Sequence, residues 1–181
     1  AILLIIMIDI NKLKIRDVVL NDSKKICEIY KHYVEFTSIS LEITIPDVEE
    51  IKKRIENILS EKYPYIVVED EKEGVIGYAY ASKFNEREGF KYTSSISIYL
   101  DPCTHSKGIG QKLYDELEKR LKKMKIVQIV SVINGENEKS IKFHQKNDFI
   151  KIGCFTDAAY KLEKWHDILW MVKKINSLEI I

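Results

Sequence analysis

Two glycines, Gly108 and Gly110, stand one residue apart between a stretch that indicates a strand, 91–100, and a stretch that indicates a helix, 110–124. Glycine has no Cβ, so the backbone N–H groups of such a turn can approach an anion closely. The first turn of the following helix adds N–H groups without intrahelical partners and the positive end of the helix dipole. The pattern predicts a cradle for a phosphate or pyrophosphate, unless the glycines serve only the turn.

The spacing around these glycines excludes two other phosphate-binding motifs. The dinucleotide fingerprint requires a third glycine three residues after the second, and Leu113 occupies that position. The loop that binds nucleoside triphosphates requires Gly-Lys-Ser/Thr after four intervening residues, and the sequence has no such run. A phosphate held at this turn therefore belongs to a ligand of another class.

Strand and helix patterns alternate from Lys12 onward, with no repeat or low-complexity stretch between them. Asp47 and Glu50 predict a capping box that begins one helix. The expected apolar stripe of that helix is Val48, Ile51, Ile55, Ile58 and Leu59. The other expected helices follow 21–23 and cover 110–124 and 137–146, and the expected strands lie near 13–18 and over 65–68, 75–84, 91–100, 126–133, 149–155 and 168–172. This order predicts an α/β fold with a mixed sheet.

The composition is that of one globular domain. The chain has 181 residues, of which 45% are hydrophobic and 31% are charged. Lys and Arg number 29 against 28 Asp and Glu, so the net charge of +1 gives no reason to expect nucleic acid or a membrane as partner. The three cysteines are far apart, which favours reduced thiols in a cytoplasmic protein and offers no metal-binding spacing.

The first residues, 1–8, form an apolar run. The run is far shorter than the ~20 residues of a membrane helix, and it lacks the basic leading segment and cleavage site of a signal peptide. We expect an N-terminal extension here and a single domain over 12–175.

Short stretches in the same order along 14–173 resemble the GNAT superfamily of N-acetyltransferases, and within it the phosphinothricin acetyltransferase branch. The segment His105–Gln111 is similar to the family signature Gln/Arg-x-x-Gly-x-Gly/Ala, with a histidine as its first residue. The other matching stretches are 29–34, 40–42, 77–79, 87–90, 97–100, 137–140, 143–144 and 164–167. The resemblance implies the GNAT fold, a mixed and mostly antiparallel sheet of about 6–7 strands flanked by about four helices.

The resemblance also implies acetyl-CoA as cosubstrate, without a metal. The backbone of 98–100 would pair with the pantetheine arm as an added strand does, and the glycine loop would hold the pyrophosphate. Lys107 and Lys112 would add positive charge there, while Asn137 and Ser140 would contact the arm near the thioester. The implied cofactor-binding residues are Ile98, Tyr99, Leu100, Ser106, Lys107, Gly108, Ile109, Gly110, Gln111, Lys112, Asn137 and Ser140.

The implied reaction is the direct transfer of an acetyl group to an amine. Only the neutral form of the amine can attack the thioester. A free alkyl amine has a pKa near ~10, so a base or a water relay usually assists. The amine would enter near Phe36, Glu42 and Arg87. His144 stands where many members carry a tyrosine acid and this branch carries histidine, which implies a catalytic role for it.

The sequence departs from the branch at the residue expected to act as base. Members carry Thr-Val-Glu on the strand where this chain reads Thr93-Ser94-Ser95, so Ser95 replaces the glutamate. A serine hydroxyl can position a water but cannot take a proton from an ammonium group at neutral pH. The base is then a water chain, Glu42 or His144, or the acceptor has a lower pKa, or catalysis is lost. A smaller departure is Asp148, which replaces a glycine after the last helix.

Three functions follow from these observations. The first is an N-acetyltransferase for a small amine, such as an amino acid or an analogue like phosphinothricin or methionine sulfone. The second is a protein of the same fold that binds acyl-CoA or an amino acid without turnover, and the third is a protein N-terminal acetyltransferase. The resemblance also implies a homodimer.

Overall fold

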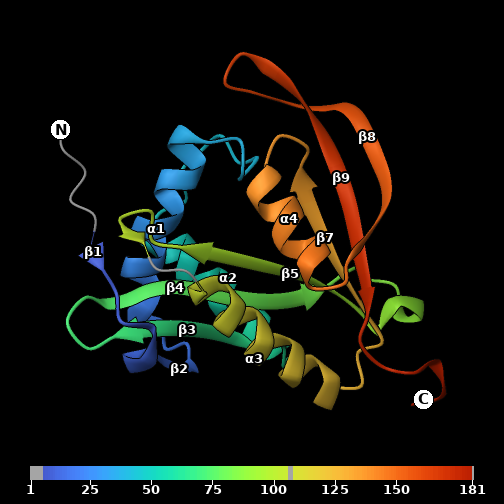
Figure 1. The fold of residues 1–181 in the computed structure, drawn as a ribbon, viewed down its shortest axis with the longest axis horizontal. Helices are drawn as coiled ribbons and strands as arrows, with labels where there is room; N and C mark the ends of the chain where they lie inside the picture. The colour runs from blue at the N-terminus through green and yellow to red at the C-terminus, as the bar shows by residue number, and fades with distance from the viewer. Residues whose placement is uncertain (1–5, 106–107, 181) are drawn as a thin grey trace. The chain divides into compact units, whose positions relative to one another are not determined.

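The computed structural model describes residues 6–105 and 108–180. Its α-helices are α1 Ser23–Phe36, α2 Val48–Ser60, α3 Ile109–Lys123 and α4 Glu138–Lys146. Its strands are β1 Ile6–Met7, β2 Lys14–Asp17, β3 Tyr65–Asp70, β4 Gly74–Lys83, β5 Thr93–Leu100, β6 Thr104–His105, β7 Gln128–Asn134, β8 Ile150–Lys161 and β9 Lys164–Lys174. Seven strands form a mixed sheet in the order β2-β3-β4-β5-β7-β9-β8 (Figure 1). The predicted α/β class with four helices is confirmed.

The chain folds into two compact units. The first unit holds the described residues up to His32 with Pro46–Ser82 and Ser97–Leu121, and the second holds Tyr33–Ile45, Lys83–Ile96 and the described residues from Lys122 onward. Strand β5 contributes to both, since its first half belongs to the second unit and its last four residues to the first.

Strands β2, β3 and β4 of the first unit form an antiparallel meander. The strand β3 is buried on both faces at 65–68, as its run of apolar and β-branched residues predicts. Helix α1 buries Ile26 and Ile29, and helix α3 buries Leu113, Leu117 and Leu121 completely. These apolar residues recur at the three- and four-residue spacing of one helix face, so the core face of each helix can be read from the sequence.

Helix α2 begins where the sequence predicts, and its apolar stripe is narrower than predicted. Oδ1 of Asp47 accepts a hydrogen bond from the backbone N–H of Glu50 at 2.8 Å, which caps the helix. Ile51 and Ile55 are buried, whereas Leu59 is 41% exposed. The assignment of Leu59 to the core stripe was wrong, because the residue lies in the last turn, just before the chain leaves the helix.

Part of the N-terminal segment that we expected to be an extension forms a separate two-stranded sheet within the first unit. Residues Ile6 and Met7 form β1 and pair in parallel with Thr104 and His105 of β6. The segment continues through a short 3-10 helix, Ile10–Lys12, into β2. This pairing was invisible in the sequence, because two residues carry no periodic pattern.

Strands β7, β9 and β8 lie in the second unit. The first half of β5 pairs in parallel with β7, and β7 pairs antiparallel with β9. Strands β8 and β9 extend as a long hairpin with register shifts between Lys151 and Gly153 and between Phe155 and Ala159 (Figure 1). Both strands are longer than the sequence predicts, because β8 is largely exposed and lacks the apolar alternation of a buried strand. Of the helices described, none has the length and apolarity to cross a membrane.

Two aliphatic residues of α2, Ile55 and Leu59, provide a matched test of this packing. We expect Ile55→Ala to lower the free energy of unfolding by about 2–5 kcal/mol, because it leaves a cavity at a completely buried position. We expect Leu59→Ala, one turn later and exposed, to cost less than about 1 kcal/mol. Urea unfolding of both variants measures the difference, and equal losses would contradict this account of the helix.

Candidate functional site

Helix α4 carries three predicted site residues and begins at a fixed point after β7. Oδ1 of Asn137 accepts a hydrogen bond from the N–H of Ser140 at 3.1 Å and so caps the helix. The turn ahead of it is held by Asn134, whose Oδ1 accepts from the N–H of Glu136 at 2.9 Å. Asn137 thus has a structural use as well as its predicted contact with the cofactor.

One turn into this helix, Ser140 fixes the ring of His144. Nδ1 of His144 lies 2.8 Å from the backbone oxygen of Ser140 and 3.3 Å from its hydroxyl oxygen. A carbonyl oxygen can only accept a hydrogen bond, so Nδ1 carries the proton. In the neutral ring, Nε2 is then the basic nitrogen.

The surroundings of His144 favour the neutral ring. The residue is only 8% exposed, and the rings of Phe143 and Phe149 contact it edge to face at centroid distances of 5.5 and 4.8 Å. Burial lowers the pKa of His144 below its ordinary value of 6.5, against an opposing contribution from the hydrogen bond to Ser140. A neutral imidazole with a fixed Nδ1–H can accept a proton at Nε2 near neutral pH.

The turn that ends α4 places Phe149 against this ring. Asp148 has a φ of 65°, in the left-handed region that asparagine and aspartate tolerate better than most residues. Its N–H donates to the oxygen of Gln145 at 3.1 Å, and the N–H of Phe149 donates to the oxygen of His144 at 3.0 Å. This is the glycine-type helix ending, so the aspartate keeps the turn that the branch builds with glycine.

Ser95 lies on β5, opposite Val130 of β7 in the parallel pairing. Its backbone oxygen accepts a hydrogen bond from the hydroxyl of the buried Ser94 at 3.2 Å. The side chain of Ser95 is partly exposed, and it can orient a water molecule but cannot act as the base. Among the three residues predicted to be catalytic, His144 and Glu42 are the ones able to accept a proton.

The three residues predicted to bind the acceptor are all accessible. Phe36 ends α1 with 65% of its surface exposed, which excludes a core role for it. Arg87 is exposed before the short 3-10 helix Glu88–Phe90, and its N–H donates to the side chain of Asn85 at 3.0 Å. Glu42 is partly exposed in the loop 37–45, and its N–H donates to the hydroxyl of Ser40 at 3.3 Å.

The end of β5, in the first unit, carries the predicted pantetheine-binding backbone. Tyr99 is held from two sides, edge to face by Tyr30 at 5.2 Å and stacked by Tyr78 at 5.5 Å. Gly77 of β4 allows the strands to approach, because a Cβ there would lie 3.1 Å from the oxygen of Tyr99. The N–H of Asp101 donates to the oxygen of Ile76 at 2.8 Å and fixes the point where the strand ends.

The glycine loop lies in the first unit, and its predicted members Ser106 and Lys107 fall outside the described residues. Gly108 has a φ of 98°, in the left-handed region that favours glycine. Its oxygen accepts from the N–H of Lys112 at 3.0 Å, so helix α3 begins here and the positive end of its dipole lies at this turn. Ile10 packs against the turn, since a Cβ on Gly108 would lie 2.7 Å from Ile10 Cδ1.

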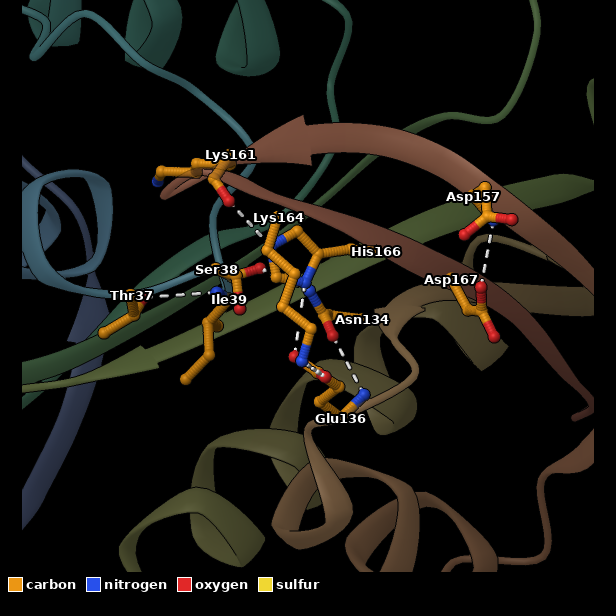
Figure 2. A network of polar contacts seen from close by, with 10 residues as sticks. All are labelled: Thr37, Ser38, Ile39, Asn134, Glu136, Asp157, Lys161, Lys164, His166 and Asp167. Carbon is orange, nitrogen blue, oxygen red and sulfur yellow. Dashed lines mark hydrogen bonds and ion pairs between the residues drawn. The ribbon is translucent and has the colours of Figure 1, made fainter.

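Sequence reasoning missed a polar network in the second unit. Its side chains come from the end of β7, the hairpin of β8 and β9 and the loop after α1, and they include Asn134, Glu136, Lys161, Lys164 and His166 (Figure 2). In this network, Nε2 of His166 lies 2.9 Å from the oxygen of Lys161. The signal for this network in the sequence was a lysine next to the apolar end of a strand. The sequence does not distinguish such a lysine from one on the surface.

No group of three or more His, Cys, Asp or Glu is arranged to hold a metal ion within 6–105 and 108–180.

Comparison with known proteins gives a consistent set of relatives. A family model described as an acetyltransferase (GNAT) domain matches residues 15–170. Phosphinothricin N-acetyltransferase of Streptomyces viridochromogenes is 28% identical over 86% of this chain and 84% of its own length. L-methionine sulfoximine/L-methionine sulfone acetyltransferase of Salmonella typhimurium is 28% identical over 86% of this chain and 91% of its own.

A solved structure extends the comparison to three dimensions. A GNAT superfamily phosphinothricin acetyltransferase from Sinorhizobium meliloti, in complex with AcCoA, has 35% sequence identity and a TM-score of 0.86. The match covers 90% of this chain and 88% of that one.

The burial of His144 predicts a pH dependence of stability. The unfolded ring binds a proton more readily than the folded ring, whose pKa is below 6.5, so the free energy of unfolding should fall as the pH drops from 6.5 through the folded pKa. Urea unfolding across that range measures the loss. His144→Asn keeps an amide donor for the oxygen of Ser140 and does not titrate, so it should remove this part of the pH dependence. An NMR titration that gives the ring a pKa at or above 6.5 would contradict the account.

Proposed function

The chain belongs to the GNAT family of acetyltransferases, and we propose that it transfers the acetyl group of acetyl-CoA to the amine of an amino acid or an amino-acid analogue. Phosphinothricin and methionine sulfone are the first acceptors to test, because relatives that cover most of the chain are named for such substrates. The observation that carries the proposal is the ring of His144, buried, with Nδ1 directed at a carbonyl and Nε2 left as the basic nitrogen.

The residues of the first unit suit the two ends of the acetyl-CoA molecule. The backbone of Ile98–Leu100 offers strand-type N–H and C=O groups to the pantetheine arm, which is itself a chain of amides. The first turn of α3 offers N–H donors and a positive dipole to the pyrophosphate, and Lys112 adds a charge nearby. We assign Ser106, Lys107 and the stretch Gly108–Gln111 to the same phosphate-binding role.

The residues of the second unit supply the acid–base chemistry. When bound, acetyl-CoA provides the acetyl group and a thiolate leaving group. The acceptor gives up one proton as its nitrogen forms the new C–N bond and the C–S bond breaks, and the thiolate takes up a proton, so protons and charge balance. Nε2 of His144 is the group we assign to the acceptor's proton, and the imidazolium formed can return that proton to the thiolate.

Ser95 and Glu42 have supporting roles in this proposal. Ser95 replaces the glutamate of the branch and orients a water through which a proton can reach bulk solvent. Glu42 offers a carboxylate to the cationic form of the acceptor, together with the exposed ring of Phe36 and, for an acceptor carboxylate or phosphinate, the guanidinium of Arg87. We assign to Asn137 and Ser140, at the cap and first turn of α4, a contact with the cofactor arm near the thioester.

The test is a thiol-release assay after calorimetric titration with acetyl-CoA. We expect micromolar binding of acetyl-CoA and thiol release with at least one of methionine sulfone, phosphinothricin or the common amino acids. In His144→Asn we expect kcat to fall by about 10²–10⁴-fold with an unchanged KM for acetyl-CoA, because the variant loses the base and keeps the hydrogen bond to Ser140. The acidic limb of the kcat profile should disappear in the same variant.

Other outcomes discriminate among the alternatives. Binding without turnover across a broad panel of amines would favour a sensor protein, and turnover of peptides in preference to free amino acids would favour a protein N-terminal acetyltransferase. Ser95→Glu adds the carboxylate of the branch, so a rise in kcat would show that a base at this position is lacking in the natural chain. Failure to bind acetyl-CoA would refute the proposal.

We also propose a homodimer in the cytoplasm. The support for a dimer is the apolar surface of the edge strand β8, where Ile150, Ile152 and Phe155 are 64%, 58% and 67% exposed. The support for the compartment is the state of the three cysteines, all of which are free thiols. We also propose that 12–175 is a single domain, and the support is a family match that spans residues 15–170.

The dimer has its own test. We expect light scattering to give twice the mass of 21.2 kDa for the natural chain and a monomer mass for Ile152→Lys, because a charge in an apolar interface is costly to desolvate. Leu59→Lys, at an exposed apolar residue of α2, is the control and should leave the mass unchanged. A monomeric natural chain would remove the dimer.

A further inference from the structure

The loop 37–45 is held at two backbone oxygens by buried side chains of the second unit. Nζ of Lys161, at the end of β8, donates to the oxygen of Ser40 at 2.6 Å and approaches the oxygen of Tyr33 at 3.5 Å. Nδ2 of Asn134, at the end of β7, donates to the oxygen of Ser38 at 3.0 Å. Figure 2 shows both side chains directed at the loop. Two of the four residues after Phe36 are therefore held by buried donors, although the loop has no regular secondary structure.

Lys161 is an unusual residue for such a position, because it is only 6% exposed. Burial lowers the pKa of its ammonium group, and the negative charge of Glu42 opposes that effect. A buried ammonium must recover its lost hydration from acceptors, and here those acceptors are the loop carbonyls. The ammonium group of Lys161 and the conformation of the loop are therefore coupled, because the loop cannot move away without leaving a buried cation unpaired.

A second set of contacts fixes the backbone of Lys161. Nε2 of the buried His166 donates to the oxygen of Lys161 at 2.9 Å. Nδ1 of His166 lies 3.3 Å from Oε2 of Glu136, so the two form an ion pair when the ring is protonated. Lys164 pairs with the same carboxylate, and its hydrogen bond lowers the pKa of Glu136.

These contacts close into a ring. The backbone N–H of Glu136 donates to Oδ1 of Asn134, and Nδ2 of Asn134 donates to the oxygen of Ser38 in the loop. When His166 is protonated, the hairpin of β8 and β9, the start of α4 and the loop after α1 are therefore joined by one continuous set of hydrogen bonds and ion pairs (Figure 2).

This network of contacts also reaches Glu42, a residue of the proposed acceptor site. The hydroxyl of Ser40 accepts the N–H of Glu42, while the carbonyl of Ser40 accepts the ammonium of Lys161. Ser40 is itself buried, at 3% exposure. Any rotation of this residue that breaks the bond to Lys161 also moves Glu42.

We propose that Lys161, supported by His166, is a positioning residue that holds the loop 37–45 and its Glu42 in the shape that binds the acceptor amine. The inference rests on the proposed function, because the role of Glu42 comes from it. Lys161 does not touch the acceptor in this account, and it acts through Ser40.

The first experiment compares Lys161→Met with Lys174→Met. Methionine keeps the unbranched apolar stem and removes the ammonium, while Lys174 is an exposed lysine of β9 in the same unit. We expect Lys161→Met to raise the KM for the amine by about 10-fold or more with a change of less than about twofold in the KM for acetyl-CoA, because a charge-assisted hydrogen bond is lost at the loop alone. Lys174→Met should leave both values unchanged. An unchanged KM for the amine, or equal losses for both substrates, would overturn the proposal.

The support from His166 is tested by a pair of variants. His166→Gln keeps an N–H that can reach the oxygen of Lys161, whereas His166→Leu removes every donor. We expect the glutamine variant to retain an amine KM close to that of the natural chain and the leucine variant to behave as Lys161→Met does. Equal KM values in the two variants would remove His166 from the proposal.

A measurement that needs no turnover separates this inference from the proposed function. Hydrogen exchange of the amides 38–45 should become faster by about 10-fold in Lys161→Met and stay unchanged in Lys174→Met. If the natural chain releases no thiol with any amine, the proposed function fails, while faster exchange of the loop would still show that Lys161 orders it. Unchanged exchange in Lys161→Met would overturn the positioning role whatever the activity.

Discussion

The side chain of Asn134 is the contact on which the second unit most depends. It stands buried at the last position of β7, where the strand gives way to the turn before α4. Its Nδ2 donates to the loop after α1 and its Oδ1 accepts the N–H of Glu136, so one amide fixes both the loop 37–45 and the start of the helix. An amide suits this position because it is a donor and an acceptor at once, which neither a carboxylate nor an ammonium group can be.

The chemistry of α4 follows from that fixed start. Once the cap at Asn137 sets the first turn, the carbonyl of Ser140 points one turn onward to Nδ1 of His144, and the left-handed turn at Asp148 places Phe149 on the other side of the ring. The surroundings of His144 then determine both its tautomer and its charge. The carbonyl of Ser140 keeps one proton on Nδ1, and burial disfavours a second proton on Nε2 because it lowers the pKa of the ring. In the proposed mechanism, a ring held ready to accept a proton matters more because Ser95 stands where the branch is expected to carry a glutamate, which leaves fewer groups to take the acceptor's proton.

Lys161 and His144 show two opposite uses of burial. Burial lowers the pKa of both groups, but the ring of His144 responds by staying neutral, while the ammonium of Lys161 has loop carbonyls to replace its hydration. The neutral ring is available for proton transfer, and the cation is committed to holding backbone. The difference lies in the acceptors within reach and in the intrinsic basicity of each group.

The sequence by itself determined the α/β class, the buried faces of α1 and α3, the cap of α2 at Asp47 and the glycine that turns into α3, because each depends on residues close together in the chain. It also carried the family resemblance, through short stretches around positions such as 97–100 and 143–144. The sequence did not predict the exposure of Leu59, the pairing of β1 with β6 or the full length of β8. Each of these depends on which surface is covered in the folded protein rather than on a local pattern. Only the tertiary structure decided that Lys161 is buried and that His166, Glu136 and Asn134 close a ring around the loop 37–45. Those residues lie as far apart as 121 positions in the chain, and hydrogen bonds across such separations leave no periodic trace in the sequence.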